Sequence, residues 1–205
     1  MNCNKSNVTC AAFGNILEGI YTVHMVNNGA TRPVTLTGLP ASVKELRMWV
    51  TDSQRGMQYV VSEMLATVTA FRYRAETGAL EEMQTVQLTP ADYTGTKSAA
   101  EIAIHPNRKF LYASHRGDNT IALFQIDQAT GLLTAVDRTS TEGKTPRNFA
   151  IDPSGGWLFT ANQDSGNVVI FRIDAQALDD TEHSMLPFIE KYRSIKEAVA
   201  KFGRI

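Results

Sequence analysis

The chain has 205 residues, of which 43% are hydrophobic and 20% are charged, and its formal net charge is −1. This length and composition predict one or two globular domains with a sizeable core and argue against wholesale disorder. Twenty basic against 21 acidic residues leave no global field that would attract nucleic acid or an anionic membrane. We therefore expect neither of them as a partner.

Targeting and metal-binding signals are also missing from the sequence. The two cysteines, Cys3 and Cys10, are too few for a disulfide framework and lack the spacing of a metal knuckle. No apolar run approaches the ~20 residues of a membrane helix. Glu18 interrupts the most apolar stretch near the N-terminus, which does not have the pattern of a signal peptide. These features predict a soluble, cytoplasmic protein without a metal or cofactor.

The N-terminal part divides into residues 1–20, expected to be irregular, and residues 21–57. In the second part, YTVHMV and PVTLTGL flank Asn28-Gly29, a strong short-range signal for a β-hairpin. The stretch NNGATRPVTLTGLPASVKELRMWV, within residues 27–57, resembles more weakly an accessory β-sandwich of some glycoside hydrolases. The alternative is that these residues add divergent strands to the fold that follows.

A repeat occupies residues 58–175. Residues 104–127 and 151–174 align without a gap at an offset of 47 and share proline, leucine, phenylalanine and an Ile-Asp pair. Residues 59–80 align with residues 112–133 at an offset of 53. The six extra residues fall in TPADYTGTKS (89–98), which is typical of a polar loop. Self-similarity at such a period indicates a repeat architecture.

Each copy of the repeat has the pattern of short antiparallel strands. A turn containing proline precedes an apolar run such as FLYAS or WLFTA, and a polar turn then leads to TIALFQI or NVVIFRI. Such runs, bounded by Gly, Asn, Asp and Pro, indicate strands. Three or four strands per ~40–50 residues is the size of a β-propeller blade. We predict an all-β, partial propeller of about two and a half blades; the alternative is a β-sandwich with accidental similarity.

The C-terminal residues 176–205 follow a different pattern, with a linker and then a helical period. This period predicts an amphipathic α-helix of about 15 residues, packed on the open edge of the blades. A membrane surface or a partner groove is the alternative. The apolar residues at helical spacing are Phe188, Ile189, Tyr192, Ile195, Val199 and Phe202.

The segments SAAEIAIHPNRKFLYASHRGDNTIALFQID and TPRNFAIDPSGGWLFTANQDSGNVVIFRID resemble consecutive blades of the lactonase family. That family includes propeller-type 6-phosphogluconolactonases and carboxymuconate-lactonising enzymes. The resemblance covers residues 58–174 and implies a seven-bladed propeller, a site near its central channel and metal-independent chemistry. Seven blades at the observed offset need about 330 residues. We therefore expect an incomplete or fused chain, with self-association through open blade edges or capping by its own ends as alternatives.

The chemistry implied by this resemblance needs a base, donors for an oxyanion and cations for an anionic substrate. Glu101 in SAAEIAI is the candidate base, because an acidic side chain is out of place among these small residues. Arg147 in TPRNF lies in the corresponding strand entry of the next blade, one residue short of the repeat offset, and suits bidentate capture of phosphate or carboxylate. The alternatives are a solvated glutamate at a strand edge and a surface arginine in a turn.

Other candidates come from matching positions in the copies. Arg116, Gln163 and Glu63 occupy one position in three blades, which predicts either a polar annulus at a channel mouth or ordinary turn residues. His105 is a second candidate for catalysis, although its place before a proline favours a turn role. Asn162, which aligns with His115, is a weaker candidate for lining the site.

These observations lead to a functional hypothesis with two alternatives. The leading hypothesis is a carboxylic-ester hydrolase that opens an anionic sugar lactone such as 6-phosphogluconolactone. In this hypothesis Glu101 activates water, and Arg116 and Arg147 bind anionic oxygens. The first alternative is a non-catalytic propeller fragment that acts as a binding module, and the second is a muconate-type cycloisomerase.

Overall fold

The computed structural model describes residues 20–27, 30–37, 46–74, 76–77, 79–173, 185–186 and 191–192, with side chains for 50–74, 76–77 and 79–173. Every regular element within these ranges is a β-strand, and the strand pairs are antiparallel. The all-β class predicted from the repeat is therefore confirmed over the described part of the chain.

Three sheets follow one another along the chain, and in each the order of strands in space is their order in the sequence. The first contains β3 (Leu46–Asp52), β4 (Met57–Ser62), β5 (Thr67–Arg74) and β6 (Ala79–Gln87). The second contains β7 (Ala99–Ile104), β8 (Phe110–His115), β9 (Thr120–Ile126) and β10 (Leu133–Ser140). The third contains β11 (Pro146–Ile151), β12 (Trp157–Asn162) and β13 (Asn167–Ile173), with the short β14 (Met185–Leu186) and β15 (Lys191–Tyr192) both paired to β13.

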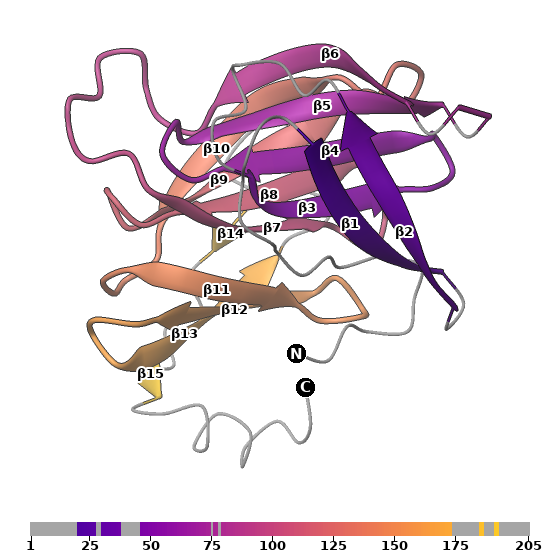
Figure 1. Cartoon of the computed structure of the whole chain (residues 1–205). Helices are drawn as coiled ribbons and strands as arrows, with labels where there is room; N and C mark the ends of the chain where they lie inside the picture. The colour runs from indigo at the N-terminus through magenta and orange to yellow at the C-terminus, as the bar shows by residue number, and fades with distance from the viewer. Residues whose placement is uncertain are drawn as a thin grey trace.

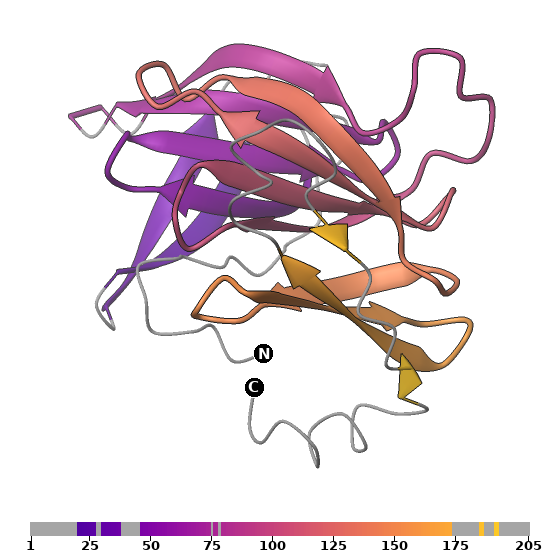
Figure 2. The same ribbon diagram turned by 180° about the vertical axis from the view of Figure 1, so that it is seen from behind.

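The three sheets are successive blades of a propeller. The first strand of the second blade, β7, lies between β3 and β11, and the later strands of each blade extend away from them (Figure 1). The view from behind shows the same succession of sheets (Figure 2). The partial propeller predicted from the repeat is thus confirmed, with two four-stranded blades and a third built on three full-length strands.

Antiparallel pairing gives the blades two distinct ends. The leading end, where the first strand of each blade starts, carries the turns at 63–66, 116–119 and 163–166. The trailing end, where the first strands finish, carries the turns at 53–56, 106–109 and 153–156.

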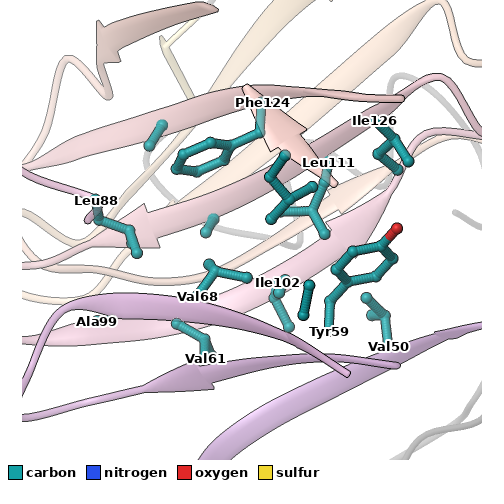
Figure 3. Packing of buried hydrophobic residues seen from close by; sticks show 14 of the residues in the cluster. Val50, Tyr59, Val61, Val68, Leu88, Ala99, Ile102, Leu111, Phe124 and Ile126 are labelled. Carbon is teal, nitrogen blue, oxygen red and sulfur yellow. The ribbon is translucent and has the colours of Figure 1, made fainter. Parts of the chain in front are cut away.

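Apolar side chains fill the gaps between consecutive blades. Tyr59 and Val68 of the first blade pack with Leu111 and Phe124 of the second in one cluster (Figure 3). A second cluster joins the second blade to the third, and in β9 alternate residues face the two clusters. Middle strands buried on both faces explain the nearly continuous apolar runs in the sequence. Each fully buried large side chain contributes about 1.5–3 kcal/mol to the free energy of folding.

The segment before the repeat contributes to two different sheets. β1 (Ile20–Asn27) pairs antiparallel with β2 (Ala30–Thr37) in a separate two-stranded sheet, in which Asn27 lies opposite Ala30. The Asn28-Gly29 turn predicted between these strands lies outside the described residues. β3, in contrast, pairs with β4 and completes the first blade. The blades therefore start at Leu46 rather than at residue 58. Residues 46–57 belong to the first blade, which agrees with the alternative that this segment adds strands to the propeller. The free edge of β4 explains this, because its backbone groups need a partner strand.

The C-terminal helix predicted for the last 30 residues falls mostly outside the described residues, as do residues 1–19. Lys191 and Tyr192, which lie within the predicted helix, are instead strand residues paired with Val169 and Val168 of β13. At these two positions the helical prediction is wrong. Because β13 is the last full-length strand of its blade, its outer edge offers backbone groups that favour an added strand.

Candidate active site at the leading end of the blades

Each blade begins with a β-bulge in its first strand. A bulge leaves residues unpaired, bends the strand and redirects side chains, and bulges are over-represented next to active sites. The bulges of β7 and β11 contain Glu101 and Arg147, the predicted base and anion-binding group. The pairing register shifts between Leu46 and Met48, between Ala99 and Ile102, and between Pro146 and Asn148.

The Glu101 carboxylate is half-buried and is held from two sides. The backbone N–H of Ile102 donates to its Oε1 over 3.1 Å, and the side-chain amide of Asn148 in β11 donates to its Oε2. The N–H of Glu101 itself donates to Oγ of the buried Ser114 at 3.0 Å. The strand and the neighbouring blade together therefore orient this carboxylate.

A buried histidine positions the start of β7. Nε2 of His115 accepts the N–H of Ser98 at 3.2 Å, so the ring proton is on Nδ1, which donates to Oδ1 of Asp118 at 2.7 Å. Burial opposes the ionisation of Asp118, but hydrogen bonds from His115 and Thr120 outweigh it and hold the pKa of Asp118 below its usual value. The loop predicted at 89–98 is thereby attached to the end of β8.

Arg116 reaches from the second blade to the first. Its Nη2 pairs with Oε1 of Glu63, which occupies the same place in the preceding turn, and also donates to the carbonyl of Ala99 at 3.3 Å. Both side chains are mostly buried, at 13% and 17% exposure. Arg116 and Glu63, two of the three matched polar positions, thus form an ion pair at the leading end. This ion pair partly neutralises the charge of Arg116.

Arg147 and Gln163 are exposed neighbours at the leading end of the third blade. Nη1 of Arg147 donates to Oε1 of Gln163 at 3.2 Å. The backbone N–H of Gln163 donates to the carbonyl of Thr145 at 2.8 Å, which anchors the turn next to the start of β11. An exposed guanidinium in this position is suited to contact an anionic group.

His105 lies at the trailing end, about 13 Å from Glu101 at the usual rise of a strand. It is 4% exposed, its Nδ1 accepts the N–H of Asn107 at 3.2 Å, and its Nε2 donates to the carbonyl of Gly155 at 2.9 Å. Backbone groups engage both ring nitrogens. The structure therefore places His105 in backbone contacts at the trailing end, one within its own turn and one to the next blade, and does not bring it to Glu101.

Asn162 is also buried, at 2% exposure, beneath the loop that follows β10. Its Nδ2 donates to the carbonyl of Thr141 at 3.1 Å. A Cβ at Gly143 would lie 2.2 Å from Nδ2 of Asn162, so the loop packs directly on this side chain. Asn162 supports the loop before β11, and its side chain does not reach the surface of the leading end.

Asn148 is not among the site residues that we predicted from the sequence, although the repeat places it at the position equivalent to Glu101. It follows Glu101 by the repeat offset of 47 and is the corresponding residue of the next blade. A comparison of what each copy carries at the position of Glu101 would have selected it. Its contact with Glu101 depends on the packing of β7 against β11, which the sequence does not display.

Two further properties concern bound metal and membranes. Among the described residues, no group of three or more His, Cys, Asp and Glu side chains is arranged to hold a metal ion. The same part of the chain contains no helix with the length and apolar character that a bilayer span requires.

The fold and its polar leading end define a β-propeller whose candidate site lies where the first strands begin. Residues 47–186, more than half of the chain, match the family described as "Lactonase, 7-bladed beta-propeller". The chain therefore belongs to this lactonase family.

Curated relatives share part of the chain. A 6-phosphogluconolactonase of Bacillus subtilis is 36% identical over 118 residues, which are 58% of this chain and 34% of the relative. A 6-phosphogluconolactonase of Formosa agariphila is 51% identical over 80 residues, which are 38% of this chain and 23% of the relative. The chain thus spans about a third or less of these relatives.

Solved structures share the fold over a longer part of the chain. A protein of Lactobacillus plantarum has a TM-score of 0.71 and 27% identity, over 84% of this chain and 49% of its own. The periplasmic gluconolactonase of Pseudomonas aeruginosa has a TM-score of 0.68 and 24% identity, over 86% of this chain and 51% of its own. The second likeness concerns the fold alone.

Proposed function

We propose that this chain forms part of a lactonase that opens a sugar lactone such as 6-phosphogluconolactone by adding water to the ring ester. The observation that carries the proposal is the Glu101 carboxylate, oriented by Ile102 and Asn148 at the start of an inner strand. Family membership and the names of the curated relatives support the choice of reaction and of substrate class. A cytoplasmic location stays a prediction.

In this reaction Glu101 removes a proton from water as the water oxygen attacks the carbonyl carbon. The tetrahedral intermediate collapses with cleavage of the bond to the ring oxygen, which takes the proton from Glu101. The product is the open-chain hydroxy acid, and the reaction needs no oxidant, reductant or further reactant. Proton transfer by a positioned carboxylate contributes about 10²–10⁴-fold to such a rate.

The arginines are proposed to bind the anionic parts of the substrate and the developing oxyanion. Arg147 is adjacent in sequence to Asn148, which contacts Glu101, and Arg116 donates to a carbonyl two residues before Glu101. Gln163 holds the Arg147 guanidinium in place. His105 and Asn162 are left outside this site, because both are buried and engaged by backbone carbonyls.

The proposal is tested on the full chain, after circular dichroism and cooperative unfolding show that it is folded. Acid release from 6-phosphogluconolactone and from gluconolactone is compared with the spontaneous rate, and ring closure of a carboxymuconate is measured in parallel. We expect faster opening of the lactones, with the phosphorylated one preferred. A folded protein that accelerates neither lactone contradicts the proposal. Turnover of the muconate alone identifies a cycloisomerase, and saturable lactone binding without turnover identifies a binding module.

A further inference from the structure

We infer that Asn148 is a positioning residue that orients the Glu101 carboxylate for proton abstraction; this inference rests on the proposed lactonase function. Asn148 lies in the bulge region of β11, and Glu101 lies in the bulge of β7. The first strands β7 and β11 are neighbours in the fold. The two side chains therefore meet across the boundary between the second and third blades.

The chemistry of the contact suits orientation. Only the amide nitrogen of Asn148 can donate, and an ionised carboxylate only accepts, so the direction of the bond to Oε2 is determined. The other oxygen, Oε1, receives the N–H of Ile102 at 3.1 Å. Two donors from different blades restrict rotation of the carboxylate about its terminal bonds. An ionised carboxylate offers about four acceptor positions, of which these two bonds use one on each oxygen.

The neutrality of asparagine matters as much as its geometry. A lysine or arginine at position 148 would donate equally well, but its positive charge would stabilise the anion and weaken the base. The adjacent cation, Arg147, donates to Gln163 instead. Asn148 thus supplies a donor to Glu101 without adding a charge.

Removing the hydrogen bond between Asn148 and Glu101 should lower the catalytic rate, because the rate depends strongly on the geometry of the reacting groups. A misplacement of about 1 Å at a reacting group can lower a rate by about 10²-fold. Glu101 lies in a bulge, where the regular ladder of the strand does not hold the backbone. We therefore expect the orientation of its side chain to depend on Asn148.

The test compares Asn148→Ala and the isosteric Asn148→Asp with the unchanged full chain, using lactone opening as the assay. We expect kcat to fall about 10–100-fold in Asn148→Ala with KM changed less than about 2-fold. Asn148→Asp should lose at least as much, since it places a second carboxylate against Glu101. In Asn148→Ala, the acid limb of the plot of kcat against pH should move to higher pH, because a donor to the ionised base is gone.

Asn107→Ala serves as the matched control, because Asn107 is an exposed asparagine of the β7–β8 turn at the trailing end. It should leave kcat and KM unchanged. If Asn148→Ala raises KM and leaves kcat intact, Asn148 binds substrate and the inference is wrong. If it lowers only the melting temperature, the contact is structural and the inference is also wrong. Absence of turnover by the unchanged protein overturns the proposed function itself, and the inference with it.

Discussion

His105 of the second blade donates from Nε2 to the carbonyl oxygen of Gly155 in the third blade, at 2.9 Å. The same two positions meet between the first and second blades, where Oδ1 of Asp52 lies 3.8 Å from Nη1 of Arg108. Consecutive blades are thus joined at the trailing end by equivalent contacts of different chemistry. Both contacts lie at the end of the blades opposite Glu101. They join the blades there without using side chains of the leading end, where the candidate site lies.

This contact predicts an unequal effect of adding a methyl group at two glycines. Both Gly155 and Gly166 have positive φ, at 77° and 63°. A Cβ at Gly155 would lie 2.6 Å from Cε1 of His105, whereas a Cβ at Gly166 meets nothing within 4 Å. Gly166→Ala should lose about 1 kcal/mol of unfolding free energy through backbone strain alone.

Gly155→Ala should lose that amount and about 1–3 kcal/mol more, because the ring of His105 must move. Urea unfolding of both variants gives the comparison. Equal losses would show that His105 does not pack on Gly155 as described.

Two tyrosines at equivalent positions of the first and second blades provide a matched pair. The hydroxyl of Tyr59 donates to the carbonyl of Gly131 at 2.8 Å, whereas the buried hydroxyl of Tyr112 has no hydrogen-bond partner among the described residues. Tyr59→Phe leaves a buried carbonyl without its donor and should cost about 1–3 kcal/mol.

Tyr112→Phe removes an unsatisfied group and should be neutral or slightly stabilising. Denaturant unfolding of the two variants tests this, and a loss of stability in Tyr112→Phe similar to that in Tyr59→Phe would contradict it.

The attachment of the 89–98 loop predicts a pH dependence of stability. The pKa of Asp118 is lower in the folded protein than its usual value of about 3.9. Its carboxylate therefore stabilises the fold fully above the unfolded pKa, and this contribution is lost as pH falls through the lower folded pKa. Unfolding free energy measured across this acidic range should fall more steeply for the unchanged protein than for Asp118→Asn. The exposed loop variant Asp92→Asn is the control, and identical slopes for the protein and Asp118→Asn would refute the role of Asp118.

The ion pair between Arg116 and Glu63 predicts a change in substrate binding. In Glu63→Gln the charge of Arg116 is no longer partly neutralised, so KM for a phosphorylated lactone should fall about 3–10-fold while KM for a neutral lactone changes little. Arg116→Ala should raise KM for the phosphorylated lactone. Steady-state kinetics with both lactones measure this difference. The same change in KM for the two lactones would mean that Arg116 does not bind the anionic group.

The repeat made the blades predictable, because the phase of its apolar residues reports which faces of the middle strands are buried. Glu101 was selected from its local sequence, because a carboxylate is out of place on packing grounds among Ala99, Ala100 and Ile102. β3 was not predictable in this way, because LRMWVTD has no counterpart in the motifs and its place depends on pairing with β4.

Contacts between blades were also hidden from the sequence. The partners Asn148 of Glu101 and Glu63 of Arg116 lie 47 and 53 residues away, and only the packing of consecutive blades brings them together. His105 differs in that one of its contacts is local: its Nδ1 accepts the N–H of Asn107, the kind of turn contact that its place before a proline favours. Position in a repeat therefore predicts where a residue lies, whereas its partner depends on the chemistry of the next copy.

The most direct measurement of the central claim is the rate of lactone opening by Glu101→Gln compared with Glu76→Gln. Glu76 is an exposed glutamate in the turn after β5, at the trailing end, so the two variants remove the same charge from opposite ends of the blades. We predict that Glu101→Gln lowers kcat by about 10²–10⁴-fold and that Glu76→Gln leaves it unchanged. Equal rates for the two variants, with both proteins folded, would contradict the assignment of Glu101 as the base.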